Sequence, residues 1–238
     1  MTNSAGGDRR SLAATPELVT DPEEKAEREA RNGLRQFDTA VALVDQWISQ
    51  PERPFRLRPS LIQQLHRVAL DGLSAFAGNW RPAGVEIHGS SHEPVGAHLV
   101  AEFIEDMCDY VNEHWDEKTA IHLAAYVMWR LNWIHPFDDG NGRTSRMVSY
   151  LVLCVRLGQR LPGKRTIPEQ IAEDRTPYYE ALDAADQGSK ESRVDVSAME
   201  KVLTGMLANQ LLDVYQDATG LGVSEQAGVL PHHNKDRT

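Results

Sequence analysis

Apolar side chains recur every three to four residues through most of this chain, which is the spacing of helices that bury one face. The helices at 119–134 and 143–157 are apolar around most of their surface, so we expect them at the centre of the fold. Further helices are predicted at residues 36–48, 61–76, 98–114, 167–185 and 194–215.

The N-terminal part of the chain changes character twice. Residues 1–20 are rich in Ser, Gly, Thr and Ala and are expected to be a flexible lead-in. Asp21 followed by Pro22 is typical of a helix N-terminus, and Gly33 is a candidate stop for that charged helix. We therefore expect N-terminal helices over residues 21–59, with regulation as a candidate role.

The segment 78–94 differs from its helical surroundings. It contains three Gly and two Pro, and the alternating residues 85–88 predict a brief β-hairpin. The predicted fold class is therefore all-α, a helical bundle with one small β element. The main domain is expected over residues 60–215, followed by a flexible tail at 216–238.

Composition narrows the possible partners. The net charge of −10 disfavours nucleic acid as the main partner, because phosphate binding needs a basic face. No apolar stretch approaches the roughly 20 residues of a membrane span, and the N-terminus lacks the apolar core of a signal peptide. Cys108 and Cys154 lie in apolar helical patterns and are expected to be buried thiols. We expect a cytoplasmic enzyme, with delivery to another cell left open.

The segment HPFDDGNGRTSR lies between the two helices that we expect at the centre. Gly140, Asn141 and Gly142 tolerate positive φ, so their backbone N–H groups can converge on an anion. This anion nest would stand at a helix N-terminus, where phosphates bind. Arg143 and Arg146 share a helix face and can clamp one polyphosphate.

Two further side chains complete the candidate site. Asp139 is placed to hold Mg²⁺ that also bridges phosphate oxygens. The unperturbed pKa of a histidine, roughly 6.5, would suit His135 as a general base acting on a hydroxyl nucleophile. The alternative is a tight turn between helices with solvated arginines. The joint order of base, carboxylate, glycines and spaced arginines favours a functional site.

This segment resembles the complete motif of the Fic family, His-Pro-Phe-x-Asp/Glu-Gly-Asn-Gly-Arg-x-x-Arg, without departure at any fixed position. Residues 85–94 resemble the family's flap and residues 175–182 its downstream helix, so the resemblance covers roughly residues 60–205. Doc-type kinases have Ala-Asn-Lys in place of Gly-Asn-Gly. The AMP-transferring branch of the family is therefore the closer match.

The resemblance implies a protein adenylyltransferase that moves AMP from ATP to a Ser, Thr or Tyr hydroxyl of a target protein and releases pyrophosphate. It implies that His135 deprotonates the hydroxyl and that Asp139 holds Mg²⁺ or Mn²⁺. Asn141 and the nest would stabilise the α-phosphate, and Arg143 and Arg146 would orient the β- and γ-phosphates. The flap would bind an extended target segment by backbone pairing; its residues are Val85, Glu86, Ile87 and His88.

Other functions remain open on this fold. The transferred group could be phosphate or another nucleotide-derived group, although the Gly-Asn-Gly sequence favours AMP. A non-catalytic module that binds nucleotide or a partner is disfavoured, because binding alone needs neither His135 nor Asp139. A DNA-binding regulator is disfavoured by the acidic charge. The sequence leaves a homo-oligomer open.

Many Fic proteins are inhibited by a glutamate that pairs with the second motif arginine, on a helix reading Ser/Thr-x-x-x-Glu-Gly/Asn. Thr20 and Glu24 match this pattern only in part, because Lys25 follows. The acidic run at residues 23–29 could deliver a carboxylate to Arg146, but a solvated charged helix is favoured. Inhibition by a separate partner protein, or no inhibition at all, stays open.

Some histidines and tyrosines have two interpretations each, one functional and one structural. His88, His92 and His98 lie near the predicted flap, but their spacing matches no zinc pattern, so polar loop residues are favoured over a metal cluster. Tyr178 and Tyr179 are candidates for an adenine pocket, although aromatic residues on helices more often belong to the core.

Overall fold

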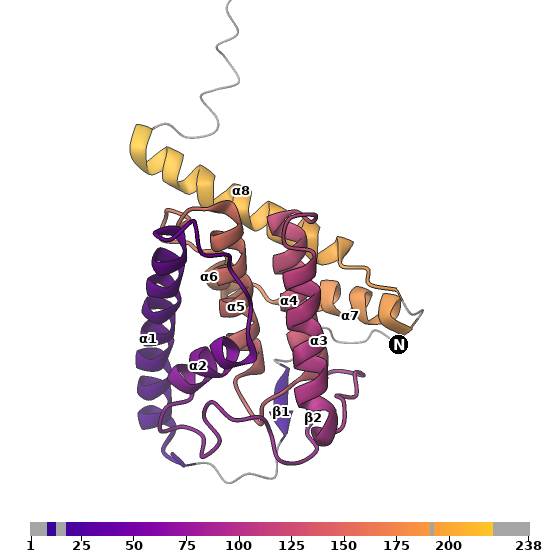
Figure 1. Ribbon diagram of the computed structural model, residues 1–238. Coiled ribbons are helices and arrows are strands. Elements are labelled where there is room, and N and C mark those ends of the chain that lie inside the picture. The colour runs from indigo at the N-terminus through magenta and orange to yellow at the C-terminus, as the bar shows by residue number, and fades with distance from the viewer. Residues whose placement is uncertain (1–8, 13–17, 191–192, 221–238) are drawn as a thin grey trace, which may run out of the picture.

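The structure, a computed structural model, describes residues 9–12, 18–190 and 193–220. Two apolar helices, α4 (Ala120–Ile134) and α5 (Asn141–Leu157), lie side by side at its centre (Figure 1). Most of their side chains are buried, as their all-round apolar pattern predicts. The loop between them carries the candidate site.

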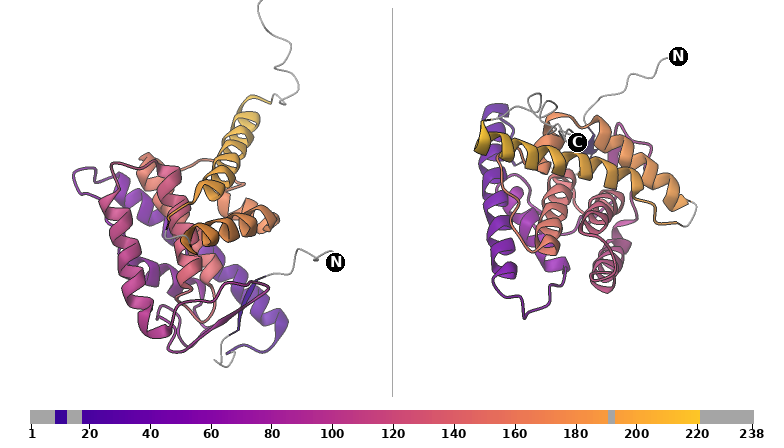
Figure 2. Two further views of the ribbon diagram at one scale, coloured as in Figure 1. Left: turned by 90° about the vertical axis from the view of Figure 1, so that its right-hand side faces the viewer. Right: turned by 90° about the horizontal axis from the view of Figure 1, so that it is seen from above.

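The other helices surround this pair. α1 and α2 cover one side of α5, α3 packs on α4, and α8 crosses one end of the bundle (Figures 1 and 2). The predicted all-α fold class is confirmed. The remaining helices are α1 (Pro22–Ile48), α2 (Pro59–Ala69), the short η1 (Ala97–Leu99), α3 (Val100–Glu113), α6 (Ile167–Glu173), α7 (Thr176–Lys190) and α8 (Ser197–Thr219).

The first helix is longer than predicted. Asp21 caps α1 as expected, since its side chain accepts a hydrogen bond from the Glu24 amide at 2.8 Å. The predicted stop at Gly33 is wrong, because α1 continues to Ile48. A glycine inside a helix costs only about 1 kcal/mol. Tertiary contacts outweigh that cost, since Asn32 and Gln36 donate to backbone carbonyls of α2 and the turn after it.

Two other helix predictions need correction. The helix expected at 61–76 ends at Ala69, and the turn that follows contains Gly72 with φ +68°. The helix expected at 167–185 is two helices, α6 and α7. The chain is extended at Asp174, and the Asp174 carboxylate accepts from the Thr176 amide at 2.9 Å, so a new helix begins there.

The small β element is built from distant parts of the chain. β2 (Glu86–His88) pairs antiparallel with β1 (Arg10–Leu12), and Ser11 lies opposite Ile87. A hairpin within 78–94 is therefore wrong, because the partner strand comes from the predicted flexible lead-in. Residues 1–8 and 13–17 of that lead-in and residues 221–238 of the predicted tail lie outside the described residues. Residues 216–219, predicted as the start of the flexible tail, belong to α8 instead. The division into domains stays a prediction.

The sequence made predictions about the two cysteines and about membrane-spanning helices. Cys108 and Cys154 are buried and unpaired, as predicted, and burial raises the pKa of Cys108 to about 12. Within the described ranges, every helix is too short or too polar to cross a membrane.

Candidate active site

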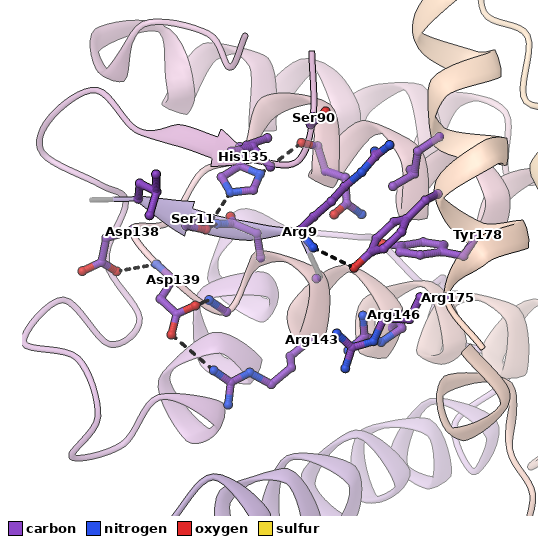
Figure 3. A pocket seen from close by; sticks show the side chains of 18 of the residues that line it. Arg9, Ser11, Ser90, His135, Asp138, Asp139, Arg143, Arg146, Arg175 and Tyr178 are labelled. Atoms are coloured by element: carbon purple, nitrogen blue, oxygen red, sulfur yellow. Dashed lines mark hydrogen bonds and ion pairs between the residues drawn. The ribbon is translucent and has the colours of Figure 1, made fainter. Parts of the chain in front are cut away.

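His135 ends α4 in the left-handed conformation, with φ 52° and ψ 59°. Its Nδ1 lies 3.3 Å from the carbonyl oxygen of Asn132, so the Nδ1 proton is donated there. Nε2 then carries the lone pair, and it lies 2.8 Å from the Ser11 hydroxyl (Figure 3). The imidazole therefore presents a hydrogen-bond acceptor to a hydroxyl group.

The surroundings of His135 favour its neutral form. Burial lowers the pKa of His135 to about 4, and the Arg81 charge acts in the same direction. The Asn132 carbonyl and the Asp139 carboxylate oppose this shift without reversing it. At neutral pH the imidazole is therefore unprotonated and can accept a proton.

Arg81 fixes the backbone of His135 and was not predicted from the sequence. Its Nε donates to the His135 carbonyl at 2.7 Å, and its two terminal nitrogens donate to the carbonyls of Ala83 and Val95. Only 3% of Arg81 is exposed. One guanidinium thus joins the base to the chain on both sides of the flap, residues 85–94. Nothing in the local sequence marks this arginine, because its acceptors are backbone groups.

The loop after His135 is closed by Asn141. The Asn141 Oδ1 accepts from the Phe137 amide at 2.9 Å, and Nδ2 donates to the Phe137 carbonyl at 2.9 Å. Phe137 is fully buried. Nδ2 also lies 3.4 Å from Ser11 Oγ. The predicted contact between Asn141 and an α-phosphate stays a prediction.

Gly140 sets the start of α5 in the left-handed conformation, with φ 74°. A Cβ at this position would lie 2.3 Å from Leu70 Cδ2, so both backbone conformation and space demand glycine. Among the residues that the structure describes, no side chain caps this end of α5. The first amides of the helix, including that of Gly142, are thus available to an anion. The Gly140 amide instead donates to Asp139 Oδ1 at 2.6 Å, and anion binding by the predicted nest stays a prediction.

The two adjacent aspartates have different surroundings. Asp138 is buried, and its carboxylate accepts from the Ser74 hydroxyl at 3.1 Å. Asp139 keeps 55% of its side chain exposed and lines the cavity beside Gly140. Its Oδ2 lies 3.3 Å from Arg143. Of the two, Asp139 has the accessible carboxylate, at the position that the motif assigns to the metal.

Three arginines face the same cavity. Arg143 and Arg146 lie on one face of α5, opposite Ser11 and His135 (Figure 3). Burial lowers the pKa of Arg146, and the neighbouring charges of Arg175 and Arg143 add to this effect. The sequence predicts no role for Arg175, which stands at the unpredicted break between α6 and α7. The cluster is a concentrated positive site in an acidic chain.

The acidic residues of α1 pair with arginines other than Arg146, in line with the favoured solvated charged helix. Glu29 lies 3.5 Å from Arg143, and Glu24 pairs with Arg28 within α1. In the described part of the chain, no carboxylate forms an ion pair with Arg146. The less favoured alternative, a contact of this run with the second motif arginine, is therefore not formed.

The cavity has a volume of about 1140 Å³, enough for a nucleotide and part of a second substrate. The nest, both motif arginines, His135 and Asp139 all line it. Tyr178 and Tyr179 also line it, and Tyr178 is fully buried, so this tyrosine belongs to both cavity wall and core.

The flap borders this cavity. Ile87 lines the cavity, and its backbone pairs with Ser11. Val85 is half-buried, and Glu86 and His88 are exposed. Binding of a target segment to these four flap residues stays a prediction.

The flap histidines do not gather into a cluster. His92 Nε2 lies 2.7 Å from the Trp133 carbonyl, and its Nδ1 lies 3.6 Å from Asp186. His88 and His98 are exposed. His92 thus ties the flap to α4 and α7. No group of three or more metal-binding side chains occurs within residues 9–12, 18–190 and 193–220.

Comparison with known proteins identifies the family. The family model described as "Fic/DOC family" matches residues 56–153. The resemblance seen in the sequence is confirmed, and this segment of the chain belongs to the Fic/DOC family. Protein adenylyltransferase fic-1 of Caenorhabditis briggsae is 33% identical over 134 residues, covering 53% of this chain and 24% of that protein. The chain therefore spans about a quarter of the length of this relative.

Solved structures agree on the fold. A Fic domain containing signaling protein from Bacteroides thetaiotaomicron matches with a TM-score of 0.65 at 22% identity, covering 82% of this chain and 75% of that chain. BepC from Bartonella tribocorum, solved with bound AMPPNP, matches with a TM-score of 0.54 at 15% identity, covering 79% and 88%.

Proposed function

We propose that this protein transfers AMP from ATP to a hydroxyl side chain of a protein and releases pyrophosphate. One observation carries the proposal: the unprotonated Nε2 of His135 faces a hydroxyl at 2.8 Å beside an arginine-lined cavity. This is the distance at which a general base removes the proton of a nucleophile.

The chain's own groups account for each part of the reaction. The hydroxyl oxygen forms a bond to the α-phosphorus, and the bond from that phosphorus to the bridging oxygen of the β-phosphate breaks. His135 takes the hydroxyl proton, and pyrophosphate leaves with the electron pair. The amides at the start of α5 bind the α-phosphate, while Arg143 and Arg146 hold the β- and γ-phosphates. Catalysis is then mainly positioning and charge stabilisation.

A divalent cation fits this site as a partner of the nucleotide. Mg²⁺ is usually held by one or two carboxylates together with substrate phosphates and water. Asp139 offers one exposed carboxylate beside the nest, and the described residues contain no three-ligand cluster. Asp139 would hold Mg²⁺ or Mn²⁺, which would neutralise phosphate charge when bound.

The comparisons support nucleotide transfer to proteins. The curated relative from Caenorhabditis briggsae is a protein adenylyltransferase, and the structure of BepC contains AMPPNP, an ATP analogue. Gly140 and Gly142 favour AMP over phosphate as the transferred group, because they leave the backbone at the start of α5 open to the α-phosphate.

ATP labelled at either the α- or the γ-phosphate distinguishes the candidate reactions. The purified full chain is incubated with Mg²⁺, cell lysate and one of the two labels. We expect covalent α-label and no γ-label on lysate proteins. Covalent γ-label would instead identify phosphate transfer. Bound nucleotide without any covalent label would identify a binding module.

Two variants then test the assigned roles. His135→Ala should lower transfer by about 10²- to 10⁴-fold, with ATP affinity nearly unchanged, because the base acts on the hydroxyl. Asp139→Ala should weaken both activity and its dependence on Mg²⁺. Glu27→Ala is a matched control, since Glu27 is exposed on α1 and pairs with Arg31. Full activity in excess EDTA would contradict the metal assignment.

A further inference from the structure

The hydroxyl that faces His135 belongs to the chain itself. Ser11 lies in β1, and β1 pairs with the flap strand β2 in antiparallel register. The flap is the surface on which the family resemblance implies that an extended target segment binds. Residues 9–12 therefore occupy the predicted position of a protein substrate.

We propose that Ser11 is an acceptor for AMP within its own chain, a proposal that rests on the proposed function. Ser11 Oγ forms a bond to the α-phosphorus of ATP, and the bond between that phosphorus and the β-bridging oxygen breaks. The Ser11 proton passes to His135 Nε2, and pyrophosphate leaves. The product is a chain with AMP esterified to Ser11.

The hydrogen bonds of Ser11 suit a nucleophile. A serine hydroxyl has one donor and two acceptor sites. The donor faces His135 Nε2 at 2.8 Å, and one acceptor site faces Asn141 Nδ2 at 3.4 Å. One lone pair is left for bond formation. Across the cavity from this hydroxyl stand Arg143 and Arg146, the side chains expected to hold the phosphates (Figure 3).

Side-chain contacts of Arg9 fix the position of the strand. The Arg9 guanidinium binds both carboxylate oxygens of Asp183, at 2.8 and 2.7 Å, and lies 4.6 Å from the centre of the Tyr179 ring. The Arg9 amide also donates to the Tyr179 hydroxyl at 3.3 Å. α7 thus binds Arg9, two residues before Ser11, while the flap strand β2 pairs with β1. These two attachments place the Ser11 hydroxyl against the general base, His135.

The first experiment maps the site of modification. The purified full chain is incubated with Mg²⁺ and ATP labelled at the α-phosphate, and the modified residue is located by tandem mass spectrometry. We expect AMP on Ser11. Ser11→Ala should lower self-labelling by about tenfold or more, because a hydroxyl held at the base has a high effective concentration. Ser11→Thr should retain labelling, and the exposed Ser60→Ala is the matched control.

The second experiment tests docking through Arg9. Arg9→Glu and Asp183→Arg should each lower Ser11 labelling by about threefold to fivefold, the effect of one exposed ion pair. The double variant should recover most of the loss, because the pair is re-formed with its charges exchanged. Loss without recovery in the double variant would contradict the docking contact.

The third experiment asks whether transfer is intramolecular. The labelled fraction at a given time should be independent of protein concentration. A His135→Ala chain mixed with the wild-type chain should remain unlabelled at Ser11. Labelling of that inactive chain would overturn transfer within one chain.

Failure of this proposal differs from failure of the proposed function. Labelled lysate proteins with an unmodified Ser11 would overturn only the Ser11 assignment, and residues 9–12 would then act as a blocking segment. The absence of α-label on every protein, Ser11 included, would overturn both. AMP on residues other than Ser11 would also reject this site.

Discussion

The imidazole of His66 stacks on the ring of Phe137, with ring centres 3.5 Å apart and planes 6° from parallel. His66 Nδ1 accepts from the Gly78 amide at 2.9 Å, so its Nε2 donates to the Asp139 carbonyl at 3.0 Å. The buried side chain of His66, on α2, thus fixes the position of the loop between α4 and α5. Because it also binds the segment before the flap, it connects the two parts of the site.

Removal of His66 should therefore destabilise the whole site. His66→Ala leaves the Gly78 amide and the Asp139 carbonyl without this partner, at about 1–3 kcal/mol each, and removes the stacking contact with Phe137. We expect the free energy of unfolding to fall by about 3–5 kcal/mol in urea titrations. The exposed His98→Ala is the control and should change it by less than about 0.5 kcal/mol. A loss below about 1 kcal/mol in His66→Ala would contradict the assigned role.

Stability should decrease in mild acid because of two buried histidines. Burial lowers the pKa of both His66 and His135 from 6.5 to about 4. Below pH 6.5 the unfolded chain binds protons that the native chain does not, so stability falls as the pH falls toward 4. Each imidazole contributes a slope of up to about 1.4 kcal/mol per pH unit. Urea titrations from pH 7 to pH 5 measure the slope. A His66→Gln variant should show a smaller slope than the wild type.

Gly140 and Gly158 lie at the two ends of α5, and substituting each of them distinguishes backbone strain from steric contact. Gly140 and Gly158 have φ of 74° and 68°, but only Gly140 lacks room for a Cβ, because of Leu70. Gly158→Ala should cost about 1–2 kcal/mol from the left-handed backbone alone. Gly140→Ala should cost more and should also lower AMP transfer. Similar stability for the two variants would show that contact with Leu70 is unimportant.

Arg81 is a positioning residue, since it acts through the backbone of His135. Arg81→Lys keeps the charge but loses the guanidinium geometry that reaches three carbonyls. We expect kcat for AMP transfer to fall by about tenfold to a hundredfold, because small displacements of a base are costly. KM for ATP should change little, and melting temperatures are compared to separate positioning from unfolding. The exposed Arg58→Lys is the matched control. An equal change in kcat and KM would argue against a positioning role.

Glu29 should weaken nucleotide binding modestly. Its carboxylate lies 3.5 Å from Arg143, an arginine expected to bind phosphate. Glu29→Ala removes this competitor, and an exposed or half-exposed ion pair is worth about 0.2–1 kcal/mol. The Kd for ATP should fall by about twofold to fivefold in calorimetric titrations. Glu27→Ala, on the same helix but paired with Arg31, should leave it unchanged. An unchanged Kd in Glu29→Ala would remove α1 from competition for the nucleotide.

Features that depend on residues close together in the sequence could be predicted from the sequence. The all-round apolar pattern of α4 and α5 predicted two central helices, since such a helix is stable only when it is surrounded. The segment from His135 to Arg146 predicted a phosphate site because its glycines, carboxylate and arginines follow one another within a few residues. Asp21 predicted the start of α1 for the same reason.

Features that join distant segments were decided only by the tertiary structure. No local pattern relates Ser11 to Ile87 or His135, and a lead-in rich in small polar residues gave no sign of a strand. Arg81 and His66 act on backbone groups, which every residue possesses, so their partners cannot be read from residue types. Gly33 remained helical because contacts with α2 outweigh a propensity of about 1 kcal/mol. The sequence alone therefore determined the motif. The tertiary structure decided that the Ser11 hydroxyl lies against the general base, His135.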